Sequence, residues 1–324
     1  MGLEEIRSFL APHLDGVESI IAQSLATDIE LLDSTNRSIR EHGGKMIRPI
    51  LSLLSALACG RINGDTLRYA AAAEILHNAT LLHDDVVDGA STRRGRPTVS
   101  ALLGPGASVL IGDFWLVRCV RTVIEASANN DEVTGLFAKT LSDLSEGELL
   151  QMQKASSGDT SVDDYIRIVY SKTASLFETS ARAAAISVKA SPEYVEALGN
   201  YASALGIAFQ IKDDIFDYVE SPSTGKPCGL DLLEQKITMP LLCAFEACPS
   251  REAEIRCMVT RIASGGASVA DITAFVAEND GVSRATAILG SYISKAVSCL
   301  EPLPASEAKS HLCQLAHFVG SRIA

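Results

Sequence analysis

Six aspartates stand in two clusters of identical spacing, in which two adjacent aspartates are followed by a third, three positions later. The clusters consist of Asp84, Asp85 and Asp88, and of Asp213, Asp214 and Asp217. Each cluster follows an apolar run of the kind that predicts a helix. Around such a helix Asp84 and Asp88 lie about 40° apart, and Asp85 about 60° from Asp88, so the carboxylates gather on one side of it.

Carboxylates gathered in this way repel one another. Aspartate is a poor helix former, and like charges four positions apart destabilise a helix by a few tenths of a kcal/mol. A solvated acidic helix end explains either cluster alone, but two clusters of the same spacing indicate a compensating cation. Magnesium prefers oxygen ligands and often joins one or two carboxylates to substrate phosphates. The clusters therefore predict magnesium ions that bind a phosphorylated substrate.

Cationic residues lie near both clusters in a chain whose formal net charge is -12. They are Lys45, Arg48, Arg93, Arg94, Lys172, Lys226 and Lys236. So acidic a chain is not expected to bind nucleic acid or to attract anions in general, so phosphate contacts must be local. Arginine forks suit diphosphate oxygens, and Lys45 and Arg48 are spaced to share a helical face. For Lys236 alone, an ordinary surface lysine remains the alternative.

The segments that carry these acidic and cationic residues are predicted to be helices. Only 5% of the residues are aromatic, and alternating β-branched strands are hard to find. Apolar periodicity predicts helices at 66–88, 107–128, 131–153, 161–189, 193–220 and 236–247. Glycine and proline clusters separate these segments. No linker divides the chain, so we predict one all-α domain over residues 1–324.

The composition of the chain also indicates the cellular compartment. No window contains the roughly 18 uninterrupted apolar residues of a membrane-spanning helix. The eight cysteines include no C-x-x-C pair, which disfavours structural zinc and predicts buried, reduced thiols. The segment from Met1 to Leu14 carries early acidic residues and lacks the pattern of a secretion signal. We therefore expect a cytoplasmic protein without a transmembrane segment.

Five motifs together resemble those of the trans-isoprenyl diphosphate synthases. They are G-G-K-M-I-R-P at 43–49, L-L-H-D-D-V-V-D-G-A-S-T-R-R-G-R-P-T at 81–98, Lys172-Thr173, F-Q-I-K-D-D-I-F-D-Y at 209–218 and G-K-P-C-G-L-D-L at 225–232. They occur in the family's order, whereas the chain beyond residue 250 matches only loosely. The resemblance implies the isoprenoid synthase fold, a single-domain helical bundle with a central active-site cavity.

The resemblance also implies a reaction: head-to-tail condensation of an allylic prenyl diphosphate with isopentenyl diphosphate. Diphosphate leaves the allylic carbon, the isopentenyl double bond attacks the cation, and a proton is then lost, with the released diphosphate as its expected acceptor. Magnesium, expected as three ions with substrate bound, neutralises the leaving group. An apolar cavity keeps water from the cation.

The family's functional residues carry over position by position. The residues that match the magnesium site are Asp84, Asp85, Asp88, Asp213, Asp214 and Asp217, some of them acting through water. Those that match the allylic diphosphate site are Arg93, Lys172, Gln210, Lys226 and Lys236, with Thr173 beside the reacting centre. Those that match the isopentenyl diphosphate site are Lys45, Arg48, His77 and Arg94. The resemblance implies a catalytic role for Asp84, Asp88, Arg93, Lys172, Thr173, Asp213 and Lys226.

Small residues precede the first cluster at Ala79, Thr80 and Ala73. Bulky aromatics at these places stop chain growth early in the family, so the resemblance implies a product longer than farnesyl diphosphate. The aromatic residues Phe114 and Trp115 are candidates either for a deeper tunnel floor or for the core.

Two other functions stay open. A class I terpene cyclase shares the first motif, but its second metal site usually mixes Asn or Asp with Ser, Thr and Glu. A non-catalytic partner subunit is expected to lose one cluster, and both are intact here. The di-iron spacing of Glu74 and His77 lacks the second copy that such a site needs. The resemblance further implies a homodimer, for which Val109 to Val120 offers an apolar face.

Overall fold

The computed structural model describes residues 2–93, 95–126, 131–219, 229–262 and 265–321. It confirms the all-α class, since helices dominate these residues and their only strands form one short hairpin. The helices are α1 Leu3–Ser24, α2 Glu30–Glu41, α3 Ile47–Cys59, α4 Gly64–Val87, α5 Val99–Leu103, α6 Pro105–Ile124, α7 Asp131–Ser157, α8 Val162–Val169, η1 Tyr170–Ala174, α9 Ser175–Ser187, α10 Pro192–Asp217, α11 Leu230–Leu233, α12 Met239–Ala247, η2 Pro249–Arg251, α13 Glu252–Arg261, α14 Val269–Glu278, α15 Gly281–Cys299 and α16 Glu307–Ser321. The hairpin strands are β1 Thr92–Arg93 and β2 Arg96–Pro97.

The Cα positions group into two compact units. Unit 1 comprises Met1–Ala138, Thr179–Gly199 and Pro302–Leu312, and unit 2 comprises Lys139–Glu178, Asn200–Glu301 and Cys313–Ala324. Four of the five boundaries fall inside helices α7, α9, α10 and α16, and the fifth, after Glu301, falls between α15 and α16. Each unit is described below by itself, and the single domain over 1–324 stays a prediction.

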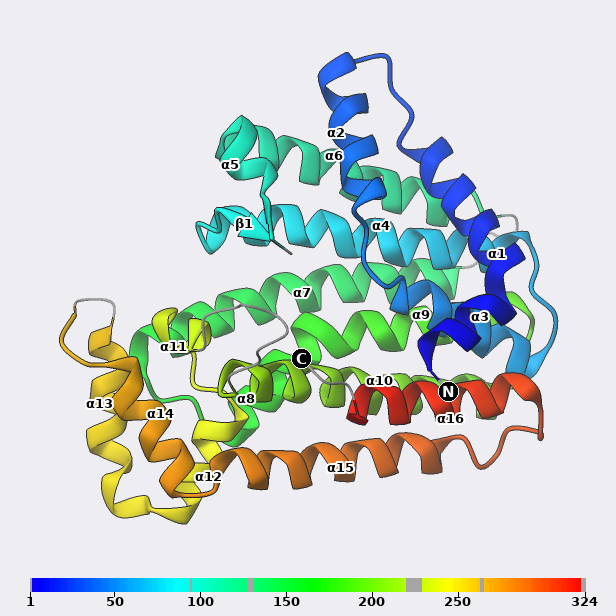
Figure 1. Cartoon of the computed structure of the whole chain (residues 1–324). Coiled ribbons are helices and arrows are strands. Elements are labelled where there is room, and N and C mark those ends of the chain that lie inside the picture. Colours follow the sequence, from blue (N-terminus) through cyan, green and yellow to red (C-terminus); the bar gives the residue numbers. More distant parts are fainter. Residues whose placement is uncertain (1, 94, 127–130, 220–228, 263–264, 322–324) are drawn as a thin grey trace. The chain divides into compact units, whose positions relative to one another are not determined.

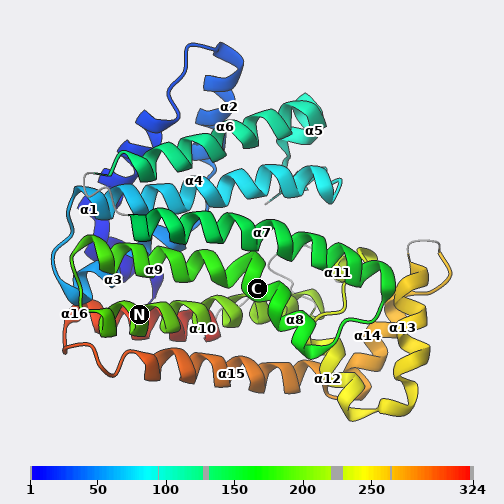
Figure 2. The ribbon, with the colours of Figure 1, turned by 180° about the vertical axis from the view of Figure 1, so that it is seen from behind.

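In unit 1, α4 packs along α6 and also contacts α3 and α1, as Figures 1 and 2 show from opposite sides. Its middle is buried because the run Ala70–Ala73 lets neighbouring helices approach closely. Asn63 caps the N-terminus, accepting from the Thr66 N–H at 3.0 Å. Gly89, with φ +62°, follows its C-terminal end. A firmly held helix therefore ends at the first aspartate cluster.

In unit 2, the segment that carries Lys172 and Thr173 is tightly enclosed. A Cβ built on Gly206 of α10 would lie 2.6 Å from the Ala174 Cα. One built on Gly147 of α7 would lie 2.6 Å from the Ser171 Cβ. Both helices therefore approach η1 so closely that only glycine fits. This segment is a π-helical turn rather than the regular mid-helix stretch that the sequence predicts, and such turns occur frequently at functional sites.

The structure corrects two further expectations. Lys45 does not share a helical face with Arg48, because Met46 has φ +54° and α3 begins only at Ile47. The thiols of the described cysteines are free, as expected, but only Cys119 and Cys243 are buried, and Cys257 is exposed. The predicted helix boundaries otherwise lie within a few residues of those observed. Among the described residues, no helix combines the length and apolar character needed to cross a bilayer.

Candidate active site

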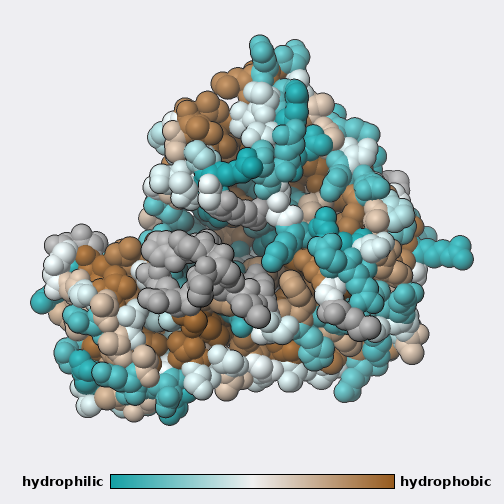
Figure 3. Space-filling model, in the orientation of Figure 1, coloured by the Kyte–Doolittle hydropathy of each residue, from teal (hydrophilic) through white to brown (hydrophobic). Residues whose placement is uncertain are grey.

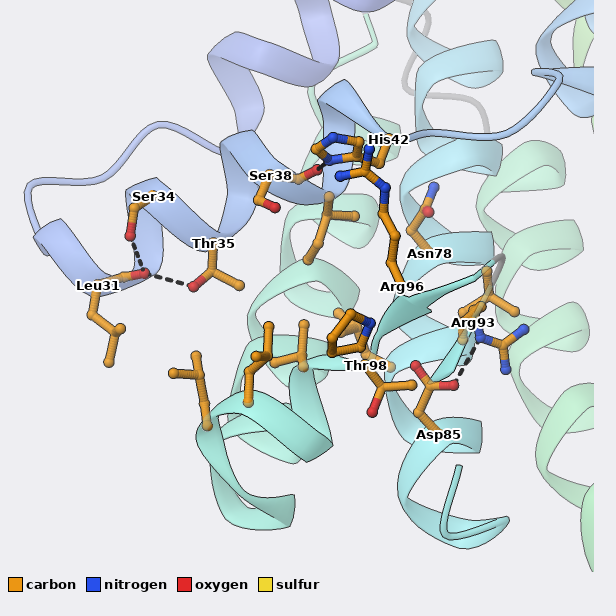
Figure 4. A pocket seen from close by; sticks show the side chains of 17 residues that line it. Leu31, Ser34, Thr35, Ser38, His42, Asn78, Asp85, Arg93, Arg96 and Thr98 are labelled. Carbon is orange, nitrogen blue, oxygen red and sulfur yellow. Dashed lines mark hydrogen bonds and ion pairs between the residues drawn. The ribbon is translucent and has the colours of Figure 1, made fainter. Parts of the chain in front are cut away.

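The first aspartate cluster lies at the C-terminal end of α4. Asp85 is only 4% exposed, and Arg93 of the hairpin donates from Nε to its Oδ1 at 2.7 Å (Figure 4). Asp84 is half-buried, and Asp88, at the C-cap, is exposed. The carbonyl groups at a helix C-terminus carry partial negative charge, so these carboxylates are unfavourably placed unless a cation lies near them. The middle aspartate, Asp85, is therefore the buried member of this cluster and binds Arg93.

Asp85 and Arg93 also border a cavity of about 610 Å³ between α2, the hairpin and α5 (Figure 4). Its other end is apolar and includes Leu31, Leu102 and Leu103. Leu102 is 67% exposed, and Figure 3 shows apolar side chains at the surface over α5.

The residues expected to bind isopentenyl diphosphate belong to unit 1. Lys45 is exposed and its carbonyl accepts from Arg7 Nη1 at 3.1 Å, while Arg48 and His77 are half-buried. Arg94 lies outside the described residues. His83, next to Asp84, lies 3.2 Å from Asp113 of α6 and 3.4 Å from the Val109 carbonyl. These contacts hold the His83 ring against α6.

In unit 2 a cavity of about 140 Å³ brings together five of the residues that the sequence singles out. They are Lys172, Thr173, Gln210, Asp214 and Lys236. Lys226 lies outside the described residues. The Lys172 ammonium pairs with Glu148 of α7, and Lys236 pairs with Glu234. Residues from α7, α8, η1, α10, α11 and the segment after α11 thus line one small cavity.

A chain of hydrogen bonds crosses this cavity. Thr173 Oγ1 donates to Gln210 Oε1 at 2.9 Å, and Gln210 Nε2 donates to Asp214 Oδ1 at 2.9 Å. Tyr165 of α8 donates its hydroxyl to Asp214 Oδ2 at 2.5 Å. Asp214 and Tyr165 are each only 4% exposed. The buried carboxylate therefore fixes the Gln210 amide, which in turn orients the Thr173 hydroxyl.

The structure adds a seventh aspartate. Asp217 accepts the backbone N–H groups of Leu230 and Asp231, both at 3.0 Å, and so holds the start of α11 against the end of α10. This contact brings Asp231, which also lines the cavity, close to Asp214 and Asp217. Sequence reasoning missed both Asp231 and Tyr165. The only signal for Asp231 was its place in the motif G-K-P-C-G-L-D-L.

The electrostatics of this cluster favour a cation. Burial, and to a smaller extent the neighbouring carboxylates of Asp213 and Asp217, raise the pKa of Asp214 to about 7, although its hydrogen bonds with Tyr165 and Gln210 act in the opposite direction. Burial also raises the pKa of Asp217, and raises that of Asp231 well above its ordinary value, with further contributions from nearby carboxylates. These groups are oxygen donors of the kind that magnesium prefers. In the part of the chain that the structure describes, no three His, Cys, Asp or Glu side chains are placed to hold an ion on their own. Diphosphate oxygens and water would complete the coordination, as magnesium commonly requires.

The residues expected to control chain length lie on α4. Ala73 and Ala79 are buried, and Thr80 is half-buried with its hydroxyl donating to the His77 carbonyl at 2.8 Å. Trp115 is a core residue, since it is fully buried and its Nε1 donates to Asn36 Oδ1 at 2.8 Å.

Removing divalent metal is expected to make stability fall as the pH rises. In the folded protein the Asp214 carboxyl keeps its proton up to about pH 7, against an ordinary pKa of 3.8. The stability that the folded protein gains by keeping this proton is therefore fully present below about pH 4, and it is lost as the pH rises through 7. In EDTA we expect the unfolding temperature to fall by on the order of 5 °C between pH 5 and pH 8, measured by differential scanning calorimetry. Asp214→Asn is expected to flatten this slope, and an unchanged slope would contradict the assignment.

Comparisons with known proteins identify the family of this chain. A model of the polyprenyl synthetase family matches residues 29–276. The all-trans-nonaprenyl-diphosphate synthase (geranyl-diphosphate specific) of Rhodobacter capsulatus is 36% identical over 328 residues, covering 99% of this chain and 98% of that protein. The octaprenyl diphosphate synthase of Haemophilus influenzae is 35% identical over 320 residues, covering 98% of this chain and 96% of that protein.

A solved structure is similar over the whole chain. It is a polyprenyl synthase from Caulobacter crescentus complexed with calcium and isoprenyl diphosphate, with a TM-score of 0.92 and 31% identity, covering 100% of this chain and 98% of that one. The family match spans most of the sequence, and the relatives align with it almost from end to end. The chain therefore belongs to the polyprenyl synthetase family.

Proposed function

We propose that this protein condenses isopentenyl diphosphate with an allylic prenyl diphosphate and releases diphosphate. It is a polyprenyl diphosphate synthase, a transferase of prenyl groups, whose product is longer than farnesyl diphosphate. The observation that carries the proposal is the unit 2 cavity, where Lys172, Thr173, Gln210 and Asp214 meet although up to 42 positions separate them in sequence. Such a meeting of family motif residues is expected for a reaction centre and not for scattered surface groups.

Magnesium fits the residues present, and we propose three ions with substrate bound. The aspartates that would hold them are Asp84, Asp88, Asp213 and Asp217, with Asp231 acting through water. When bound, the metal supplies positive charge against the leaving diphosphate. Asp85 and Asp214 instead position their partners, because Arg93 binds the first and Tyr165 and Gln210 bind the second.

The cationic residues would hold the two diphosphates. Lys172 would exchange Glu148 for an allylic phosphate oxygen, with Arg93, Lys226 and Lys236 as further contacts. Lys45, Arg48, His77 and Arg94 would bind isopentenyl diphosphate. The Thr173 hydroxyl and the Gln210 amide oxygen offer negative partial charge to the allylic cation as it forms. Released diphosphate takes the final proton.

Product length rests on the small residues at Ala73, Ala79 and Thr80, and the two relatives are named for nonaprenyl and octaprenyl products. Purified protein given farnesyl diphosphate, labelled isopentenyl diphosphate and magnesium is expected to make longer products, separated by chromatography. Thr80→Phe is expected to shorten them. Failure to consume isopentenyl diphosphate would leave the terpene cyclase or partner-subunit alternatives.

A homodimer belongs to the same proposal. On α6, Leu110 is 70% exposed and Val117 64% exposed. These two side chains, seven positions apart, stand on one helical face, which a second copy would cover. We also propose the cytoplasm as the location, which agrees with the free thiols of the described cysteines.

Tyr165→Phe is expected to lower kcat about tenfold with little change in the KM for isopentenyl diphosphate. The variant removes the hydroxyl that holds Asp214, so Gln210 and Thr173 lose their fixed orientation while the diphosphate contacts remain. Losing one buried hydrogen bond costs about 1 kcal/mol of stability. Steady-state kinetics at saturating magnesium would test this, with Tyr194→Phe, at a half-buried position in the first turn of α10, as the control. An equal loss in both variants would contradict the role.

A further inference from the structure

The far end of unit 1 contains an unusual concentration of positive charge. A cavity of about 230 Å³ lies between α1, the first turns of α4 and the last turns of α6. Its lining includes Arg68, Arg118 and Arg121 but only one acidic residue, Glu125. In a chain with a net charge of -12, three guanidinium groups around one small cavity need an explanation beyond solvation. Like charges held this close repel one another, and a single carboxylate leaves an excess of positive charge.

Each guanidinium group contacts a neighbouring group of the protein. Arg121 Nε donates to Glu125 Oε1 at 2.6 Å, and Arg68 Nη1 lies 3.7 Å from Glu125 Oε2. Arg118 stacks over the Phe114 ring at 4.7 Å from its centroid and donates from Nη2 to the Ala26 carbonyl at 3.4 Å. These contacts use only part of the five N–H donors on each guanidinium. The remaining donors can bind a ligand, and the side chains of Arg68 and Arg121, which are 38% and 62% exposed, are accessible to it.

We infer that this cavity, which we call the arginine pocket, binds a phosphate group. Arginine forks match phosphate oxygens, and the largely polar lining does not suit a prenyl chain. The pocket is distinct from the first aspartate cluster, because Arg68 and Asp84 are sixteen residues apart on α4, or about 24 Å along the helix axis.

Two sources offer this chemistry. One is inorganic diphosphate, the released product of the proposed reaction, so this source rests on the proposed function. The other is the phosphate of an anionic phospholipid headgroup. The pocket itself depends on neither, since it is defined by the three arginines.

The test compares wild-type protein with the double variant Arg118→Ala/Arg121→Ala. Calorimetric titration with inorganic diphosphate in EDTA, at low salt, is one arm. Sedimentation with phosphatidylglycerol vesicles, against phosphatidylcholine vesicles, is the other. Loss of one diphosphate-binding event, or at least about tenfold weaker binding, assigns the pocket to the free anion. Loss of phosphatidylglycerol binding assigns it to the headgroup. Arg37→Ala, which removes an arginine paired with Asp33 on α2, is the matched control.

Glu125→Gln protects the test against a misfolded double variant. It removes the only carboxylate of the pocket while keeping its shape, so it is expected to strengthen binding several-fold in the arm that responds. Both arms measure binding without turnover, so their outcome does not depend on whether the proposed reaction occurs. If the double variant and Glu125→Gln both bind diphosphate and phosphatidylglycerol as wild type and the control variant do, the arginine pocket is not a phosphate site.

Discussion

Alanine at Asp84 or at Asp213 is expected to lower kcat/KM on the order of 10³-fold. Each aspartate opens a cluster at the C-terminal end of a helix, where the helix itself disfavours negative charge. Removing one carboxylate relieves that repulsion but also removes a ligand of the ion that stabilises the leaving diphosphate. The loss should therefore appear in turnover and not in folding.

Two measurements separate this expectation from general damage. The magnesium concentration for half-maximal activity should rise in both variants, whereas the unfolding temperature in EDTA should not fall. Asp33→Ala is the matched control, because Asp33 pairs with Arg37 on the exposed side of α2 and such pairs contribute about 0–1 kcal/mol. Full activity in both Asp84→Ala and Asp213→Ala would refute the metal sites.

Gly206→Ala is expected to lower both stability and turnover. The new Cβ would lie 2.6 Å from the Ala174 Cα and 2.9 Å from its Cβ, so α10 and η1 must separate. Overpacking of this kind costs about 1–3 kcal/mol. Because η1 carries Thr173 and α10 carries Gln210, the same separation should stretch their 2.9 Å hydrogen bond. A shift of about 1 Å at a reaction centre can cost on the order of 10²-fold in rate.

The control for this variant is Gly290→Ala. Gly290 is also a helical glycine of unit 2, but nothing lies within 4 Å of its added Cβ. There alanine should raise stability by about 0.5–1 kcal/mol and leave kcat unchanged. Thermal unfolding and steady-state kinetics of both variants provide the comparison. Normal kinetics in Gly206→Ala would show that η1 tolerates displacement.

Much of the candidate site consists of residues that are close together in the sequence, and their arrangement could therefore be predicted from the sequence. The spacing of Asp84, Asp85 and Asp88 places three carboxylates on one helix end whatever the helix packs against. The apolar runs before both clusters likewise predicted α4 and α10 to within a few residues of their observed ends. Helical period is a property of the backbone, so it survives without tertiary information.

The features of the site that could not be predicted from the sequence depend on which side of each helix is buried by its neighbours. Nothing in the spacing reveals that Asp85 and Asp214 are the buried members of their clusters, since that depends on the neighbouring elements. Tyr165 lies 49 positions from Asp214, and only packing of α8 against α10 makes them partners. The π-helical turn at Lys172 likewise depends on contacts with two glycines of other helices.

The sequence by itself determined the all-α class, the two acidic helix ends, the nearby cations and the resemblance to one enzyme family, because each is written in local order and residue type. The tertiary structure alone decided that Asp231 joins the second cluster, that Tyr165 anchors Asp214, and that three arginines share a cavity far along α4. These pairings join residues distant in the chain. Their geometry follows from how the helices pack, which local periodicity does not specify.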